Sequence, residues 1–100
     1  MALDLSADGI RVNSVSPAWV WSPEVAKAAV GRREKWEPLW GSFHMPRRLC
    51  ETHEVASAIC FLLSQDASYI TSTDLPVDGG YMSMSAEGLG ENSSFAGSDY

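Results

Sequence analysis

Two stretches of the chain carry the β-branched, partly alternating pattern of short strands. Residues 10–16 (IRVNSVS) predict a strand that Pro17 ends. Residues 73–78 (TDLPVD) predict a second strand, which stops at the turn Gly79–Gly80. Between them lie more than fifty residues whose spacing is helical or irregular.

The clearest helical spacing lies in the segment just before the second strand. Apolar side chains recur there at i, i+4, i+7 and i+8, with small ones widening the stripe. The stripe consists of Val55, Ala56, Ile59, Cys60, Leu62 and Leu63. We expect Thr52 to cap this helix and Cys60 to be a small buried thiol.

Three shorter helices are predicted from their end signals. Residues 2–8 form a short amphipathic helix that Gly9 ends. The tripeptide 22–24 (SPE) combines a hydroxyl cap, a proline at the first helical position and an acid, and it opens a helix to about Ala29. A further helix is expected over residues 33–40, and residues 18–21 are expected to form a loop.

This order of elements is that of one strand–helix–strand crossover between parallel strands. The 100 residues, 45% of them hydrophobic, allow one domain at most. A parallel sheet needs neighbouring strands and helices on both faces, whereas this sheet has two members and bare edges. The sequence therefore predicts an α/β fold that is incomplete alone: a piece of a larger fold, or a chain that oligomerises heavily.

Charge and composition exclude several classes of protein. All seven Lys and Arg lie between Arg11 and Arg48, so residues 49–100 offer no basic surface to a nucleic acid. No apolar run is long enough to cross a membrane, and the N-terminus lacks a signal-peptide pattern. With only two cysteines in the chain, we expect no disulfide scaffold and a cytoplasmic setting.

Three segments, in this order, closely resemble the C-terminal part of the short-chain dehydrogenase/reductase family. They are residues 10–17 (IRVNSVSP), the helix 54–63 and residues 69–81, which end in DLPVDGGY. The resemblance covers about residues 1–81. It implies the last two strands and flanking helices of a Rossmann-like, doubly wound parallel sheet that binds NAD or NADP.

The resemblance also divides the chain. Residues 1–8 correspond to the end of the helix that carries the family's catalytic Tyr and Lys, and residues 23–46 to the mobile loop over the substrate. The Ser-, Gly- and acid-rich tail 82–100 resembles members that act on sugars or polyols. In the family, the helix 54–63 and the last strand pack against a neighbouring subunit, which implies a homo-oligomer.

The family's catalytic motifs do not occur in these residues. There is no G-x-G-x-x-G loop, and no Tyr is followed four residues later by Lys: Tyr69 is followed by Thr73, and Tyr81 by Ser85. Hydride transfer needs a held nicotinamide and a proton donor. We therefore assign no catalytic residue and expect the chain to be inactive alone.

A cofactor-contacting loop is nevertheless implied after the first strand. There the family reads Pro-Gly, three residues, then Thr, and its backbone and Thr hydroxyl hold the nicotinamide carboxamide. This chain reads Pro17-Ala18-Trp19-Val20-Trp21-Ser22. The resemblance assigns cofactor-binding positions to Pro17, Ala18, Val20 and Ser22, and substrate-loop positions to Trp19 and Trp21.

Two of the family's glycines are replaced, and each site residue also has a plainer role. Ala18 in place of glycine predicts crowding of the cofactor or a strained backbone angle, and Ser72 stands where glycine is usual. Ser22 is also a helix cap, and Trp19 and Trp21 are equally suited to packing. Trp36 and Trp40, at i and i+4, are expected to pack as a pair.

The remaining chemistry-bearing residues favour structural roles. Cys50 and His53 have ligand-like spacing, but no C-x-x-C pair accompanies them, so no metal site is expected. We expect Arg47 and Arg48 to be solvated or ion-paired.

The sequence thus resembles part of an NAD(P)-dependent oxidoreductase of a sugar, a polyol or another alcohol or carbonyl compound. Its expected partners are a missing N-terminal half or a homologous subunit. The alternatives are a fragment that complements or joins another chain, and a non-functional truncation product.

Overall fold

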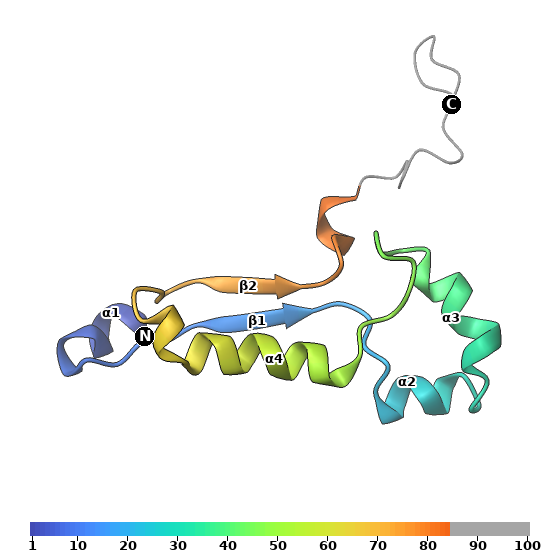
Figure 1. Ribbon diagram of the computed structural model, residues 1–100, viewed down its shortest axis with the longest axis horizontal. Helices are drawn as coiled ribbons and strands as arrows, with labels where there is room; N and C mark the ends of the chain where they lie inside the picture. Colours follow the sequence, from blue (N-terminus) through green and yellow to red (C-terminus); the bar gives the residue numbers. More distant parts are fainter. Residues whose placement is uncertain (85–100) are drawn as a thin grey trace, which may run out of the picture.

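A parallel strand pair forms the centre of the structure, a computed structural model that describes residues 1–84. Strand β1 (Ser14–Pro17) pairs with β2 (Asp74–Val77), with Ser14 opposite Asp74 and Pro17 opposite Val77 (Figure 1). The described chain thus forms a two-stranded sheet of order β1-β2. The predicted α/β crossover is confirmed.

The first strand is shorter than predicted and begins at Ser14 rather than at Ile10. Just before Ser14, hydrogen bonds of one side chain take the place of backbone hydrogen bonds between the strands. The Asn13 amide nitrogen donates to the Ile70 carbonyl at 3.0 Å, and the Asn13 amide oxygen accepts from the Thr73 N–H at 3.1 Å. Pro17 is the last residue of the strand and not the residue after it. Proline is tolerated there because the last residue of an open edge strand needs no N–H.

Helical elements connect and flank the two strands. The predicted helix 2–8 is divided into an α-helix over Ala2–Leu5 and a 3-10 turn over Ser6–Asp8. After this turn Gly9 adopts the left-handed conformation, at a φ of 73°, as predicted. The helical elements in chain order are α1 (Ala2–Leu5), η1 (Ser6–Asp8), α2 (Pro23–Ala28), α3 (Arg33–Gly41), α4 (Thr52–Leu63), η2 (Gln65–Ala67) and η3 (Tyr81–Ser83). The predicted tail lies, from residue 85 on, outside the described residues.

The cap of α4 differs from the prediction, because Glu51 and not Thr52 precedes the first turn. Glu51 and Glu54 form a capping box in which each side chain accepts from the other's backbone N–H, at 2.9 Å for the Glu51 N–H. Two carboxylates satisfy two otherwise unpaired donors in this way. Thr52 is therefore the first helical residue.

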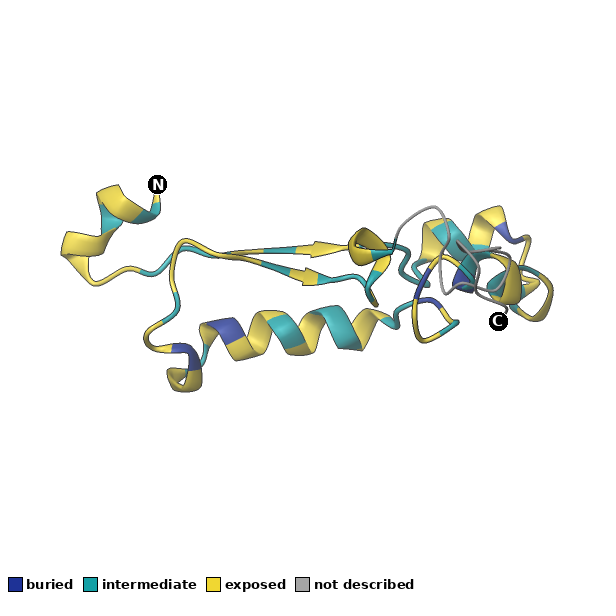
Figure 2. Ribbon diagram, turned by 90° about the horizontal axis from the view of Figure 1, so that it is seen from above, coloured by how far each residue is buried: buried dark blue, intermediate teal, exposed yellow. Residues whose placement is uncertain are grey.

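Helix α4 lies along one face of the sheet (Figure 2). Of its apolar stripe Leu62 is buried, at 7% exposure, whereas Ile59 and Leu63 are 41% and 77% exposed. Cys60 is exposed, so the expectation of a buried thiol is wrong for this chain. One helix across two strands has too little apolar surface opposite it to cover the whole stripe.

The other face of the sheet is open in the described residues. It carries the Asp74 carboxylate, which accepts from the Ser14 and Ser16 hydroxyls at 2.7 and 2.8 Å. These two hydrogen bonds lower the pKa of Asp74. None of the helices within residues 1–84 has the length and apolar character that crossing a membrane requires.

Candidate functional site: the loop after β1

The loop that follows β1 lies at the carboxyl ends of both strands, where α2 and α3 also lie (Figure 1). Open parallel sheets bind their ligands at this edge. A hollow of about 320 Å³ opens there. It lies between the strand ends, the segment before α4 and the Gly79–Gly80 turn, and its lining includes Ala18, Trp19, His44, Arg48, Cys50 and Asp78.

The loop is anchored by a single bridge that the sequence did not reveal. Val20 pairs in parallel with Cys50. The Cys50 N–H donates to the Trp19 carbonyl at 3.0 Å, and the Trp21 N–H donates to the Cys50 carbonyl at 2.8 Å. The predicted free loop 18–21 is therefore pinned to a segment thirty residues further along the chain.

The same bridge sets the direction of the Val20 backbone. Because both bonds of Cys50 go to the residues on either side, the Val20 N–H points away from it. The Val20 carbonyl accepts from the Ser22 N–H at 2.7 Å, while no acceptor for the Val20 N–H occurs in residues 1–84. An unpaired backbone donor at this edge is suited to a ligand oxygen.

The two glycine replacements differ in their cost. Ala18 is not among the residues with positive φ, so the predicted backbone strain at this position is wrong. Ser72, by contrast, adopts a left-handed φ of 62° that favours glycine. The alanine next to the candidate cofactor position therefore leaves the loop backbone relaxed.

Ser22 begins α2 as predicted. Its hydroxyl oxygen accepts from the Val25 N–H at 3.3 Å, and proline follows at the first helical position. A hydroxyl that accepts one hydrogen bond keeps its own proton for another acceptor. The capping role is thus compatible with a ligand contact.

The tryptophans form a connected cluster beside the loop. The rings of Trp36 and Trp40 stack with centroids 5.2 Å apart, which confirms the predicted pair. Trp40 also lies 5.3 Å from Trp19, and Trp19 lies 6.0 Å from Phe43. Trp19 therefore joins the loop to α3 through ring contacts, which favours its packing role.

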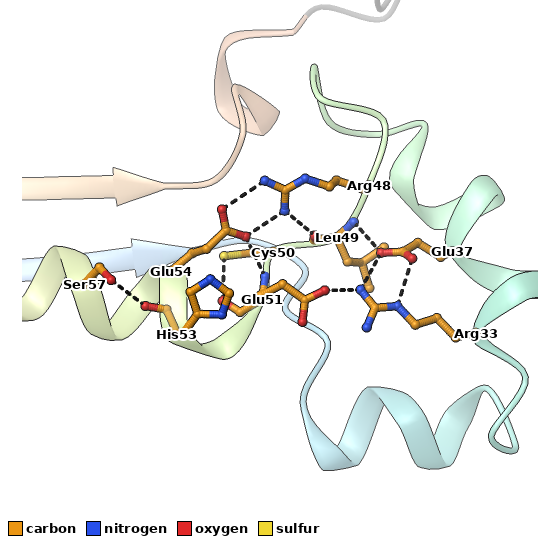
Figure 3. A network of polar contacts seen from close by, with 9 residues as sticks. All are labelled: Arg33, Glu37, Arg48, Leu49, Cys50, Glu51, His53, Glu54 and Ser57. Atoms are coloured by element: carbon orange, nitrogen blue, oxygen red, sulfur yellow. Dashed lines mark hydrogen bonds and ion pairs between the residues drawn. The ribbon is translucent and has the colours of Figure 1, made fainter.

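Trp21 lies beneath a charged side chain of α3. The Arg33 guanidinium is 4.8 Å from the Trp21 ring centroid. It also binds the Glu37 carboxylate in two-pronged fashion, at 2.9 and 3.0 Å, and it forms a second ion pair with Glu51 (Figure 3). The hydrogen bonds to Glu37 and then Glu51 raise the pKa of Arg33.

A third ion pair joins the network at the start of α4. Arg48 donates to both oxygens of Glu54, at 2.6 and 2.9 Å, as the ion-paired alternative predicted (Figure 3). The hydrogen bond from Arg48 is the main cause that lowers the pKa of Glu54 to about 2. Likewise the Arg33 hydrogen bond lowers the pKa of Glu37. All four groups are therefore charged at neutral pH.

The thiol and imidazole that line the hollow have no evident reactivity. Burial, and then the nearby Glu54, raises the pKa of Cys50, which disfavours a thiolate nucleophile. His44 is 3% exposed and its ring centroid lies 5.4 Å from that of Tyr81, and neither of its ring nitrogens has a hydrogen-bond partner among residues 1–84. Among the described residues, no three potential ligands gather around a metal position.

Of the network residues only Arg48 was considered from the sequence, as solvated or ion-paired, although two spacings indicated contacts among the others. Arg33 and Glu37 stand at i and i+4, which brings opposite charges together on one helix face. Glu51 and Glu54 stand three apart, as the two partners of a capping box do. The contacts of these two pairs with residues far along the chain have no such local signal.

Fold and site together define a class: part of a parallel α/β sheet of the Rossmann type, with the loop after β1 at its ligand-binding edge. A family model described as Enoyl-(Acyl carrier protein) reductase matches residues 1–82. The chain belongs to the short-chain dehydrogenase/reductase family.

Individual relatives agree with this assignment. The cyclohexanol dehydrogenase of Acinetobacter sp. is 38% identical over 82 residues, which are 82% of this chain and 30% of that protein. The aldohexose dehydrogenase structure of Thermoplasma acidophilum has a TM-score of 0.76 and 43% identity, and it covers 85% of this chain and 36% of its own. The structure titled ElxO with NADP bound has a TM-score of 0.72 and 31% identity over 83% of this chain and 33% of its own.

The chain thus spans about 30% of the length of the curated relatives that it matches. The Rossmann fold assigned from the sequence motifs is confirmed for this part.

Proposed function

We propose that this chain forms the nicotinamide-facing wall and the substrate loop of an NAD(P)-dependent short-chain oxidoreductase. The observation that carries the proposal is the unpaired Val20 N–H at the carboxyl edge of the sheet. The Ser22 hydroxyl stands two residues further on and retains its proton. This N–H and this O–H are two donors, and a carboxamide oxygen, which has two lone pairs, can accept from both.

In this role the residues of the loop bind and orient. The Val20 N–H and the Ser22 hydroxyl hold the carboxamide, while Pro17 and Ala18 form the floor beneath it. When bound, the nicotinamide supplies or takes up the hydride. Residues 23–46 cover the substrate, and Trp19 and Trp21 stand at its border, next to the loop backbone.

Another polypeptide segment must contribute the proton relay and the glycine-rich loop, because these 100 residues contain neither motif. We propose an N-terminal half or a homologous subunit as this partner. Its contact surfaces are the bare sheet edges and the exposed side chains of α4, including Leu63 at 77% exposure. The cyclohexanol and aldohexose dehydrogenases among the relatives make an alcohol or a sugar the proposed substrate class.

Complementation tests the proposal. The N-terminal part of the Acinetobacter cyclohexanol dehydrogenase, ending before the region matched here, is mixed with this chain. We expect the two to co-elute and to reduce NAD or NADP with cyclohexanol or glucose, which neither does alone. Turnover by this chain alone would contradict its dependence on a partner, and co-elution without turnover would contradict the proposed site.

A series at Ser22 separates cofactor binding from helix capping. Glycine caps almost as well as serine but has no hydroxyl, whereas alanine loses both functions. We therefore expect Ser22→Gly and Ser22→Ala to raise the KM of the cofactor equally, by about fivefold, and only Ser22→Ala to lower stability. Ser22→Thr is the control that keeps both, and an unchanged KM in Ser22→Gly would remove Ser22 from the site.

A further inference from the structure

One side chain of α3 makes three different contacts, within α3, with the start of α4 and with the loop 18–21. Arg33 is the first residue of α3, and its side chain is 36% exposed. It binds both oxygens of Glu37, pairs with Glu51, and covers the ring of Trp21. A planar guanidinium can serve two carboxylates and an aromatic face at once, which an ammonium group cannot.

Both carboxylates act on the segment that anchors the loop. Glu37 accepts from the Leu49 N–H at 3.1 Å, and Glu51 caps α4. Between these two positions lies Cys50, whose N–H and carbonyl hold the Trp19 carbonyl and the Trp21 N–H. The segment 49–51 is thus clamped by Arg33-bound carboxylates on one side and bonded to the loop on the other.

We propose that Arg33 is the positioning residue of the loop 18–21: by holding Glu37, Glu51 and Trp21 together, it fixes the direction of the Val20 N–H. The expected effect of Arg33 on catalysis rests on the proposed function. Its expected effect on the position of the loop does not. Arg33 acts through the anchoring segment 49–51 and the Trp21 ring.

The test is hydrogen exchange of two loop amides in the full 100-residue chain. The Trp21 and Cys50 N–H groups report on the loop, and the Ser14 N–H, which donates to the Thr73 carbonyl at 3.0 Å, reports on the sheet in the same sample. We expect Arg33→Ala to accelerate exchange at Trp21 and Cys50 about tenfold relative to Ser14. An unchanged ratio overturns the proposal.

The neighbouring arginine provides a matched control. Arg32 lies 3.7 Å from Glu34, and the two side chains are 61% and 74% exposed. We expect Arg32→Ala to leave all three amides unchanged, although it removes the same charge. Equal acceleration of all three amides in Arg33→Ala would make Arg33 a general stabiliser and overturn the proposal, as would unprotected loop amides in the unaltered chain.

A conservative variant and a kinetic measurement complete the test. Arg33→Lys keeps the charge but not the two-pronged geometry, and we expect less than half of the protection to return. In the complemented enzyme, we expect Arg33→Ala to raise the KM of the cofactor more than it lowers kcat, because the loop amide is misdirected. If complementation fails while the exchange result holds, the proposed function is lost and the positioning role stands.

Discussion

The two ends of the molecule are built in different ways. At the lid end, which comprises α2, α3 and the segment before α4, Ala29 and Leu49 are at 0% exposure, although Val30 and Leu39 are 80% and 56% exposed. At the sheet end, Ala67 and Leu62 are buried at 0% and 7% exposure. The two strands and α4 leave Ile59 and Leu63 there at 41% and 77% exposure. Figure 2 shows the second region as a thin layer with an uncovered face.

The difference lies in where each region finds its partners. The ion pairs of the lid end lie within residues 32–54 and its tryptophan contacts within residues 19–43, so the chain supplies both members of each of these contacts. The sheet end needs strands and helices that these residues do not contain. The lid end is therefore held by contacts within the chain, whereas the proposed partner would cover the sheet.

The largest expected effect on stability comes from creating a cavity at a buried position of the lid end. Leu49→Ala removes a fully buried side chain, and we expect it to lower the free energy of unfolding by about 2–5 kcal/mol. Leu63→Ala, at 77% exposure, is expected to change it by less than about 0.5 kcal/mol. Chemical denaturation followed by tryptophan fluorescence measures both.

The same pair of variants shows what the sheet end lacks. With the N-terminal complement bound, we expect the cost of Leu63→Ala to rise while that of Leu49→Ala stays constant. If Leu49→Ala and Leu63→Ala lower the free energy of unfolding of the chain alone by the same amount, the contrast between the lid end and the sheet end is wrong.

A smaller effect is expected from one substitution made at each end. Ser72→Gly relieves a left-handed φ of 62° and should stabilise the sheet end by up to about 1 kcal/mol. Ala18→Gly relieves nothing and should destabilise the loop by about 0.5 kcal/mol, because it only adds freedom to the unfolded chain. Denaturation midpoints that move in the same direction for both would contradict the assigned backbone angles.

The smallest effect concerns acid and the ion pairs of the lid end. Glu54 has its pKa lowered from 4.5 to about 2, chiefly by the Arg48 hydrogen bond. A carboxylate with a lowered pKa stabilises the fold above pH 4.5, and this contribution is lost as the pH falls from 4.5 to about 2. The loss should be small because these groups are partly exposed, and Glu54→Gln should flatten the pH dependence of the unfolding midpoint.

Most of the fold could be predicted because its signals are local. The hydroxyl-proline-acid start at Ser22, the helix end at Gly9 and the stacked pair of Trp36 and Trp40 each lie within one or two turns of sequence. The exact strand start and the α4 cap were mispredicted. In both cases a polar side chain, Asn13 or Glu51, took over backbone bonds that the apolar pattern does not record.

The site could be predicted only in part, for a related reason. The motif after β1 located the loop, but not the bridge from Val20 to Cys50, because nothing in either residue type specifies a partner thirty positions away. The prediction of backbone strain at Ala18 was wrong, because the replacement of a glycine does not by itself determine φ. The cofactor contacts of Pro17, Ala18, Val20 and Ser22 remain predictions, and the Ser22 series tests the last of them.

The bridge between Val20 and Cys50 has a consequence for how such lids diversify. Its two backbone bonds close the stem of everything between residues 22 and 48, and backbone bonds make few demands on side-chain identity. The intervening helices can therefore vary in sequence, provided that the bridge and the contacts of Arg33 and Glu37 with the segment 49–51 are retained.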